Sequence, residues 1–241
     1  MAGARTLIVT PTYNEKENLP RFLEGVRKAF PEGDILVVDD NSPDGTGDIA
    51  DAIAAEDPHV RVMHRAGKLG LATAYIQAFE KGMAEGYDRF FQMDADGSHD
   101  VKYLPDMVRA LDDGADLVIG SRNIPGGGVE GWGPGRHFIS KGGSFYARTI
   151  LGLEIRDVTA GYNGFTRKAL ETIDLATIES NGYSFQIEMK FRAIRRGLRV
   201  KEVPIVFVDR TVGKSKMSRK IFVEAMGKVW SLRAKAAMGK I

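Results

Sequence analysis

The chain has 241 residues, a formal net charge of +2 and 43% hydrophobic residues. This length and apolar share suit one globular domain, or one domain with a small appendage. The near-neutral charge gives nucleic-acid binding no electrostatic support, and the lack of cysteine excludes disulfides and thiolate metal sites. We find no signal peptide and no apolar run of the roughly 18–20 residues that a membrane span needs, so we expect a cytoplasmic protein.

Strand-like and helix-like segments alternate through the first half of the chain. The expected strands are at 6–10, 34–39, 60–64, 89–93 and 116–120. Segments with helical apolar spacing lie between them, as at Leu71, Tyr75, Phe79 and Met83. This rhythm predicts an α/β fold, a mostly parallel sheet with helices on both faces.

The second half continues with more widely spaced elements. Residues 126–135 (GGGVEGWGPG) show no periodicity, which predicts a long mobile loop without regular structure. After it we expect helices near 137–151 and 185–196, strands at 162–166 and 200–208, and a last helix from about Ser218. Without repeats or linkers, we expect one catalytic domain at 1–217 and a C-terminal helix at 218–241.

Two carboxylates, Asp94 and Asp96, end the apolar run at 89–93. Ligands of open α/β sheets bind at the carboxyl ends of the strands. Two hard oxygen anions spaced i, i+2 suit Mg²⁺ or Mn²⁺ bridging nucleotide phosphates. A lone Asp-x-Asp is more often an acidic turn, so the assignment depends on the other strand ends.

The first two strands also end in polar residues. Pro11, Tyr13 and Glu15 follow the first strand, and Asp40 follows the second. A carboxylate there can accept the ring N–H of guanine or uracil, although such residues also form turns and helix caps. No G-x-G-x-x-G follows the first strand and no P-loop motif is present, which removes the main support for dinucleotide and P-loop sites.

The order of these motifs resembles a known family. PTYNE at 11–15, VDDNSPDGT at 38–46 and MDAD at 93–96 are similar to a family 2 glycosyltransferase with the GT-A fold, and more closely to the dolichol-phosphate (polyprenol-phosphate) mannose synthases. Further segments carry the resemblance: KLGLATAY at 68–75, GSR at 120–122, Arg136 with Ser140, GYSFQIEM at 182–189, EVPIVFVDR at 202–210 and GKSK at 213–216.

The resemblance implies an activity and a donor site. It implies a metal-dependent, inverting transfer of mannose from GDP-mannose to dolichyl or polyprenyl phosphate. Guanosine would contact Pro11, Tyr13, Glu15, Val38 and Asp40. The diphosphate and a Mg²⁺ or Mn²⁺ ion would be held by Asp94, Asp96 and the backbone at Ala95, with Ser98 standing where some members have a metal-ligating Gln.

Basic residues complete the implied site. Arg122, Arg136 and Ser140 would bind the acceptor phosphate, and Lys68, Arg122, Arg210 and Lys216 would bind the nucleotide sugar. We expect Asp94, Asp96, Arg122 and Arg210 to be catalytic. The chain departs from the family pattern at Asn163, where an Arg is usual, and at Lys214, where a Glu is usual.

The C-terminal helix is amphipathic and basic. Its apolar side is formed by Ile221, Phe222, Ala225, Met226, Val229 and Trp230, and its polar side by Lys220, Glu224, Lys228, Ser231 and Lys235. Such a helix is typical of a peripheral contact with a membrane surface, here on the cytoplasmic face. Packing on its own domain or on a partner, including a small membrane subunit, is the alternative.

Three other functions fit parts of the pattern. A sister enzyme could use UDP-glucose or UDP-N-acetylglucosamine on a polyprenyl phosphate. A non-catalytic, membrane-associated subunit could bind the nucleotide without turnover, and a metal-dependent nucleotidyltransferase is a weaker third option.

Overall fold

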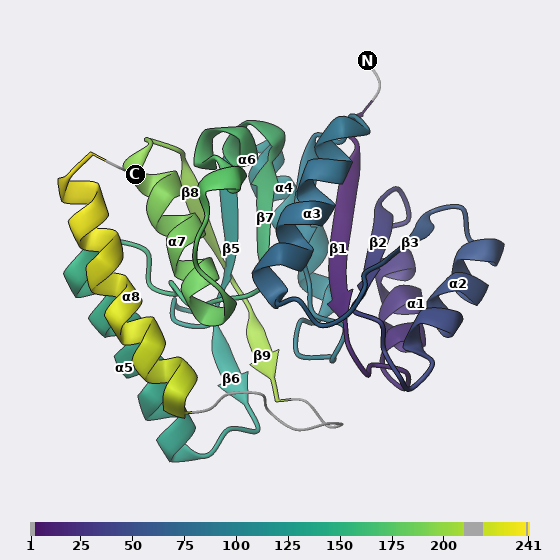
Figure 1. The fold of residues 1–241 in the computed structure, drawn as a ribbon, viewed down its shortest axis with the longest axis horizontal. Helices are drawn as coiled ribbons and strands as arrows, with labels where there is room; N and C mark the ends of the chain where they lie inside the picture. The colour runs from purple at the N-terminus through teal and green to yellow at the C-terminus, as the bar shows by residue number, and fades with distance from the viewer. Residues whose placement is uncertain (1–2, 210–218, 240) are drawn as a thin grey trace.

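A seven-stranded sheet forms the centre of the molecule (Figure 1). The computed structural model describes residues 3–209, 219–239 and 241. The strand order is β3-β2-β1-β4-β7-β5-β8, and β7 alone among these strands runs antiparallel to its neighbours β4 and β5. The strands are β1 (Thr6–Thr12), β2 (Asp34–Asp39), β3 (Val60–His64), β4 (Arg89–Gln92), β5 (Leu117–Ser121), β7 (Asn163–Thr166) and β8 (Val200–Pro204). The predicted mostly parallel sheet is confirmed.

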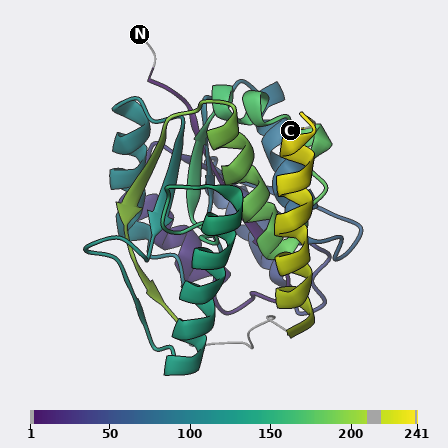
Figure 2. The same ribbon diagram turned by 90° about the vertical axis from the view of Figure 1, so that its left-hand side faces the viewer.

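Helices cover both faces of this sheet (Figures 1 and 2). The helices are α1 (Leu19–Ala29), α2 (Thr46–Glu56), α3 (Leu71–Ala84), α4 (Leu104–Asp112), α5 (Pro134–Leu151), α6 (Arg167–Ile173), α7 (Gly182–Arg195) and α8 (Arg219–Ala237). One buried cluster joins the sheet to α3, α5, α6, α7 and α8, and the other joins it to α1, α2 and α4. Figures 1 and 2 both show α5 and α8 side by side.

The sheet is apolar on both faces because successive side chains of a strand point in opposite directions. In β1, Leu7 and Val9 belong to one cluster and Ile8 to the other, and all three are fully buried. The near-continuous apolar strands of the sequence are therefore those of a sheet covered on both sides.

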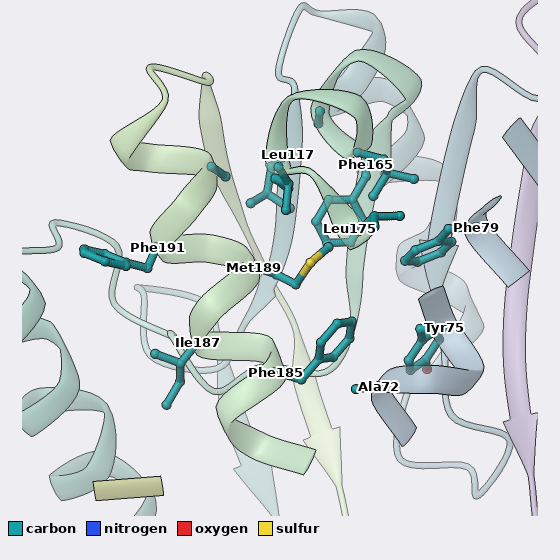
Figure 3. Packing of buried hydrophobic residues seen from close by; sticks show 14 of the residues in the cluster. Ala72, Tyr75, Phe79, Leu117, Phe165, Leu175, Phe185, Ile187, Met189 and Phe191 are labelled. Carbon is teal, nitrogen blue, oxygen red and sulfur yellow. The ribbon is translucent and has the colours of Figure 1, made fainter. Parts of the chain in front are cut away.

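Aromatic rings join α3 to the sheet and to α7 (Figure 3). Tyr75 stacks with Phe79 and with Phe185 at centroid distances of 5.8 and 6.3 Å. Phe79 also lies 5.7 Å from the ring of Phe90 and 5.9 Å from that of Phe165. These contacts fix α3 next to β4, whose carboxyl end bears the predicted acidic pair.

The prediction that residues 126–135 lack regular structure was wrong in part. β6 (Gly128–Glu130) pairs in parallel with β9 (Val206–Val208), which makes a small second sheet. The single strand expected at 200–208 is divided into β8 and β9 at Ile205. Glycine is required at position 127, directly before β6, because a Cβ there would lie only 2.5 Å from the backbone oxygen of Ser121.

The C-terminal helix packs on the domain. Among the α8 side chains that the structure describes, Val229, Leu232 and Ala236 are buried, and α8 contacts α5 and α7. Trp230, which the sequence placed on the same apolar side as Val229, is 59% exposed instead. The proposed boundary at 217/218 lies outside the described residues. Among the described residues, no helix combines the length and apolarity needed to cross a bilayer.

Candidate active site

The polar strand ends meet at one edge of the sheet. Four strands run in the same direction: β1 pairs in parallel with β2 and β4, and β5 is parallel to β4 because both are antiparallel to β7. Their carboxyl ends therefore lie at the same edge of the sheet, and they are followed in the chain by Glu15, Asp40, Asp94 and Arg122. Because β7 is antiparallel, the turn that precedes it (157–162) reaches this edge as well. The edge therefore combines carboxylates with an arginine, as a site for a charged ligand requires.

The acidic turn after β4 is largely enclosed. Asp96 and Ser98 are buried and Asp94 is half-buried. The hydroxyl of Tyr75 donates to Asp94 Oδ1 at 3.3 Å, and the backbone N–H of Ser98 donates to Asp96 Oδ1 at 3.0 Å. Burial, with the charges of Asp94 and Asp96, raises the pKa of Tyr75 well above its usual value, so Tyr75 remains a neutral donor.

His99 anchors this turn, a role that the sequence did not suggest. Its Nδ1 accepts the backbone N–H of Asp94 at 2.9 Å, and its ring stacks on Tyr162 at 5.1 Å. Since Nδ1 accepts, the neutral ring carries its proton on Nε2. The ring of Phe207 in β9 meets His99 edge-on at 6.0 Å. The small second sheet thus supports the acidic turn.

Asp40 is buried beside an arginine. The guanidinium Nη1 of Arg65 lies 2.9 Å from Asp40 Oδ1, and Arg65 Nη2 donates to Thr73 Oγ1 at 2.6 Å. Burial raises the pKa of Asp40, while the positive charges of Arg65 and Lys68 act against that rise. Arg65 was not among the predicted residues, although it ties the end of β2 to the segment that begins α3.

The other residues predicted to bind the nucleotide differ in their contacts and in their burial. The ammonium of Lys68 lies 4.5 Å from the ring centre of Tyr13, as a cation–π contact. The Glu15 carboxylate accepts a hydrogen bond from Asn18 Nδ2 at 2.8 Å. Pro11 is half-buried and Val38 is fully buried in the core. A ligand in the crevice could therefore meet Val38 only through its backbone.

Arg122 is held by an enclosed carboxylate. Its Nε and Nη2 donate to Asp157 Oδ2 and Oδ1, each at 2.7 Å, and the two side chains are only 9% and 0% exposed. Burial alone would raise the pKa of Asp157, but the charge and hydrogen bonds of Arg122 bring it below its usual value. Such a two-point pair fixes the plane of the guanidinium.

A small pocket opens beside Arg122. Its volume is about 80 Å³. It is lined by Arg122, Asn123, Gly127, Gly128, Val129, Trp132, Ser140 and Lys141. The guanidinium carbon of Arg122 lies 5.8 Å from the ring centre of Trp132 and 5.5 Å from that of Phe207. The pocket therefore offers cations, a hydroxyl and aromatic surface to one ligand.

The side chains of three predicted site residues lie outside what the structure describes. Arg136 lies within α5, but its side chain is outside what the structure describes. Arg210 and Lys216 also lie outside the described residues. Of the predicted acceptor residues, the structure brings Arg122 and Ser140 to one pocket.

Comparison with known proteins shows what the chain is similar to. A family model described as Glycosyl transferase family 2 matches residues 7–174. An undecaprenyl-phosphate mannosyltransferase from Micrococcus luteus is 53% identical over 233 residues, which cover 96% of each chain. A polyprenol monophosphomannose synthase from Mycolicibacterium smegmatis is 50% identical over 96% of this chain and 88% of its own.

Solved structures share the fold. A glucosyl-3-phosphoglycerate synthase from Mycobacterium tuberculosis in complex with Mn²⁺, UDP-glucose and phosphoglyceric acid superposes with a TM-score of 0.69 at 19% identity, covering 97% of this chain and 81% of its own. A mannosyltransferase from Pyrobaculum calidifontis in complex with GDP-Man and Mn²⁺ gives 0.62 at 16% identity, covering 97% and 64%. At these identities the likeness concerns the fold alone, which is that of the GT-A glycosyltransferases.

Proposed function

Since this chain belongs to glycosyl transferase family 2, we propose that it transfers mannose from GDP-mannose to the phosphate of a polyprenyl phosphate. One observation carries the proposal. A chain that is 53% identical to an undecaprenyl-phosphate mannosyltransferase brings Asp94, Asp96 and the paired Arg122 to one edge of its sheet. The two acids suit the donor diphosphate with its metal, and the arginine suits the acceptor phosphate.

The donor would bind along the ends of β1, β2 and β4. Tyr13 offers a ring face beside the base, and Asp40 offers a carboxylate that accepts the N–H groups of guanine. Arg65 holds that carboxylate from inside the protein at 2.9 Å. The Mn²⁺ and GDP-Man of the Pyrobaculum neighbour are consistent with such a donor.

The acidic pair fits a divalent metal. Mg²⁺ is usually bound by one or two carboxylates together with substrate phosphates and water. In the described part of the chain, no group of three His, Cys, Asp or Glu gathers around one point, so Asp94 and Asp96 would leave the remaining positions to phosphate and water. Ser98, buried next to Asp96, would add a hydroxyl at most. A bound Mg²⁺ or Mn²⁺ would neutralise charge on the departing diphosphate.

The transfer itself needs little from a base. A phosphate monoester has a second pKa of about 6, so its oxygen is already anionic at neutral pH. That oxygen attacks the anomeric carbon, the bond from this carbon to the diphosphate breaks, and GDP leaves with the electron pair. One displacement inverts the sugar to a β-mannosyl phosphate. Arg122 would orient the attacking phosphate, because Asp157 fixes the guanidinium plane.

A membrane contact would bring the enzyme to its lipid substrate. Trp230 of α8 and Phe145 of α5 are 59% and 68% exposed, and α5 and α8 lie side by side. Exposed aromatic residues with neighbouring cations are typical of peripheral helices. The cytoplasmic face and any small membrane subunit belong to this proposal.

The test is a donor screen with purified protein. GDP-mannose, UDP-glucose and UDP-N-acetylglucosamine are offered with a short polyprenyl phosphate and Mg²⁺ or Mn²⁺, and the lipid product is identified by mass. Mannosyl phosphoryl polyprenol from GDP-mannose is the expected product. A glucosyl or N-acetylglucosaminyl product would assign the sister activity. Nucleotide binding without any product would identify a non-catalytic subunit.

A further inference from the structure

A buried lysine of α7 holds the turn that precedes β7. The side chain of Lys190 is fully buried, and its ammonium donates to the carbonyl oxygen of Ala160 at 2.7 Å. The same carbonyl accepts a hydrogen bond from Asn163 Nδ2 at 3.1 Å. Two donors from different elements therefore fix this point of the turn.

The turn touches both parts of the candidate site. At its start, Asp157 pairs with Arg122, and Thr159 Oγ1 accepts from Arg122 Nη2 at 2.9 Å. Further along, a Cβ on Gly161 would lie 3.3 Å from His99 Cε1 and 3.9 Å from Asp94 Oδ2. Movement of this turn would thus displace Arg122 and crowd the acidic turn.

Charged side chains from several elements lie around the turn. Asp157 faces Arg122 directly, and its backbone N–H donates to Glu202 Oε1 of β8 at 3.0 Å. Asp157 and Glu202 act to raise the pKa of Lys190, while burial, the largest effect, and Arg122 lower it. Lys190 is therefore a second basic group beside two carboxylates, and its side chain is fully buried.

Position 163, which also contacts Ala160, departs from the family pattern. In the family pattern that the sequence resembles, an arginine is usual at this position, whereas Asn163 is neutral and fully buried. Its Nδ2 donates to Gln92 Oε1 and Gln186 Oε1, each at 2.9 Å, in addition to Ala160. In this chain the basic group next to the turn comes from α7 instead of β7.

We propose that Lys190 is a positioning residue for the transfer: through Ala160 it fixes the turn at 157–163, and so holds Arg122 in the orientation that receives the acceptor phosphate. Lys190 places a basic group beside the turn from α7, where the family pattern that the sequence resembles would supply one from position 163. The role of Arg122 in this statement rests on the proposed function, whereas the link from Lys190 to the turn does not.

The first experiment compares Lys190→Met with the wild type. Methionine has a similar length but no charge and no donor. The KM for a short polyprenyl phosphate, such as farnesyl phosphate, should rise by about 10-fold or more, because small misplacements of a positioning group are costly. The KM for GDP-mannose should stay close to the wild-type value. Lys28→Met, which removes an exposed lysine of α1 whose side chain is 75% exposed, is the control and should change neither constant.

The second experiment moves the basic group from α7 to β7. Asn163→Arg alone adds a second buried cation next to Lys190 and should lower the melting temperature. Combined with Lys190→Met, the same substitution should recover most of the acceptor KM. A merely space-filling lysine would not show this rescue. Where Lys190→Met does not fold, Lys190→Gln gives the same comparison, and a recovery of folding by Asn163→Arg supports the proposal.

Three results separate the possible failures. A wild-type enzyme that transfers mannose while Lys190→Met keeps its acceptor KM overturns this inference and leaves the proposed function intact. An equal loss for donor and acceptor that Asn163→Arg does not recover also overturns it. A wild type that transfers no mannose overturns the proposed function. The titration of farnesyl phosphate into both proteins, without donor, then still tests whether Lys190 supports that site.

Discussion

The clearest consequence of a buried Lys190 is an unusual dependence of stability on pH. Burial lowers the pKa of this lysine from 10.5 to about 7 in the folded protein. Between these values the unfolded chain binds one more proton than the folded chain, so the free energy of unfolding rises with pH. The penalty is fully present below about pH 7 and disappears as pH approaches 10.5. At about 1.4 kcal/mol per pH unit, the rise between pH 7 and pH 9.5 amounts to about 3 kcal/mol.

The measurement is chemical denaturation of the wild type and of Lys190→Met at several pH values from 7 to 9.5. The difference between their free energies of unfolding removes the titration of all other groups. This difference should move in favour of the wild type by about 3 kcal/mol over the range. Lys28→Met, the control above, shows what the loss of an exposed lysine does. A difference that does not change with pH would refute the burial argument, because an unshifted lysine gives no such slope.

Three further predictions address the site and the last helix. Asp96→Ala should reduce mannose transfer by about 100-fold or more at saturating Mg²⁺ or Mn²⁺, because one of two carboxylate ligands is lost; near-normal turnover contradicts the metal assignment. Asp40→Ala should weaken GDP binding by about 1–3 kcal/mol, as measured by calorimetry, and should remove the preference for GDP over UDP. Equal affinities of the wild type for GDP and UDP would contradict the role of Asp40. On α8, Trp230→Ala should weaken salt-dependent flotation with anionic liposomes while stability stays constant. Leu232→Ala, two residues away but at a side chain only 1% exposed, should cost about 2–5 kcal/mol of stability instead.

The sequence predicted those elements of the fold that the residues of a single segment indicate. The strand from Thr6 and the strand from Asp34 are apolar over their length, and the alternation with helices implies a parallel sheet. The insertion of β7 between β4 and β5, with reversed direction, has no local signature, since it depends on which strands find each other. The same holds for β6, whose three residues acquire strand geometry only by pairing with β9, 78 positions later in the chain.

The carboxylates of the site were predictable for a similar reason, and their partners were not. Asp40 and Asp94 stand directly after strands, so a parallel sheet brings them to one edge whatever the details of packing. Arg65 and His99 contact these residues through side chains and backbone groups that no spacing rule relates to the motifs. A histidine five residues after an acidic strand end was the only signal available for His99.

The last helix shows what a periodic apolar pattern predicts and what it leaves open. The sequence gives α8 an apolar stripe and leaves open whether this stripe meets a membrane or the protein itself. In the structure Val229 and Leu232 enter the core next to α7, and Lys228 and Lys235 both lie near the carboxylate of Glu179, at 3.7 and 2.6 Å. Val229 of the stripe is thus used by the protein, whereas Trp230 points away from the core and is exposed. A membrane contact, if it is made by α8, would therefore involve the face bearing Trp230, which the hydrophobic pattern alone would have buried.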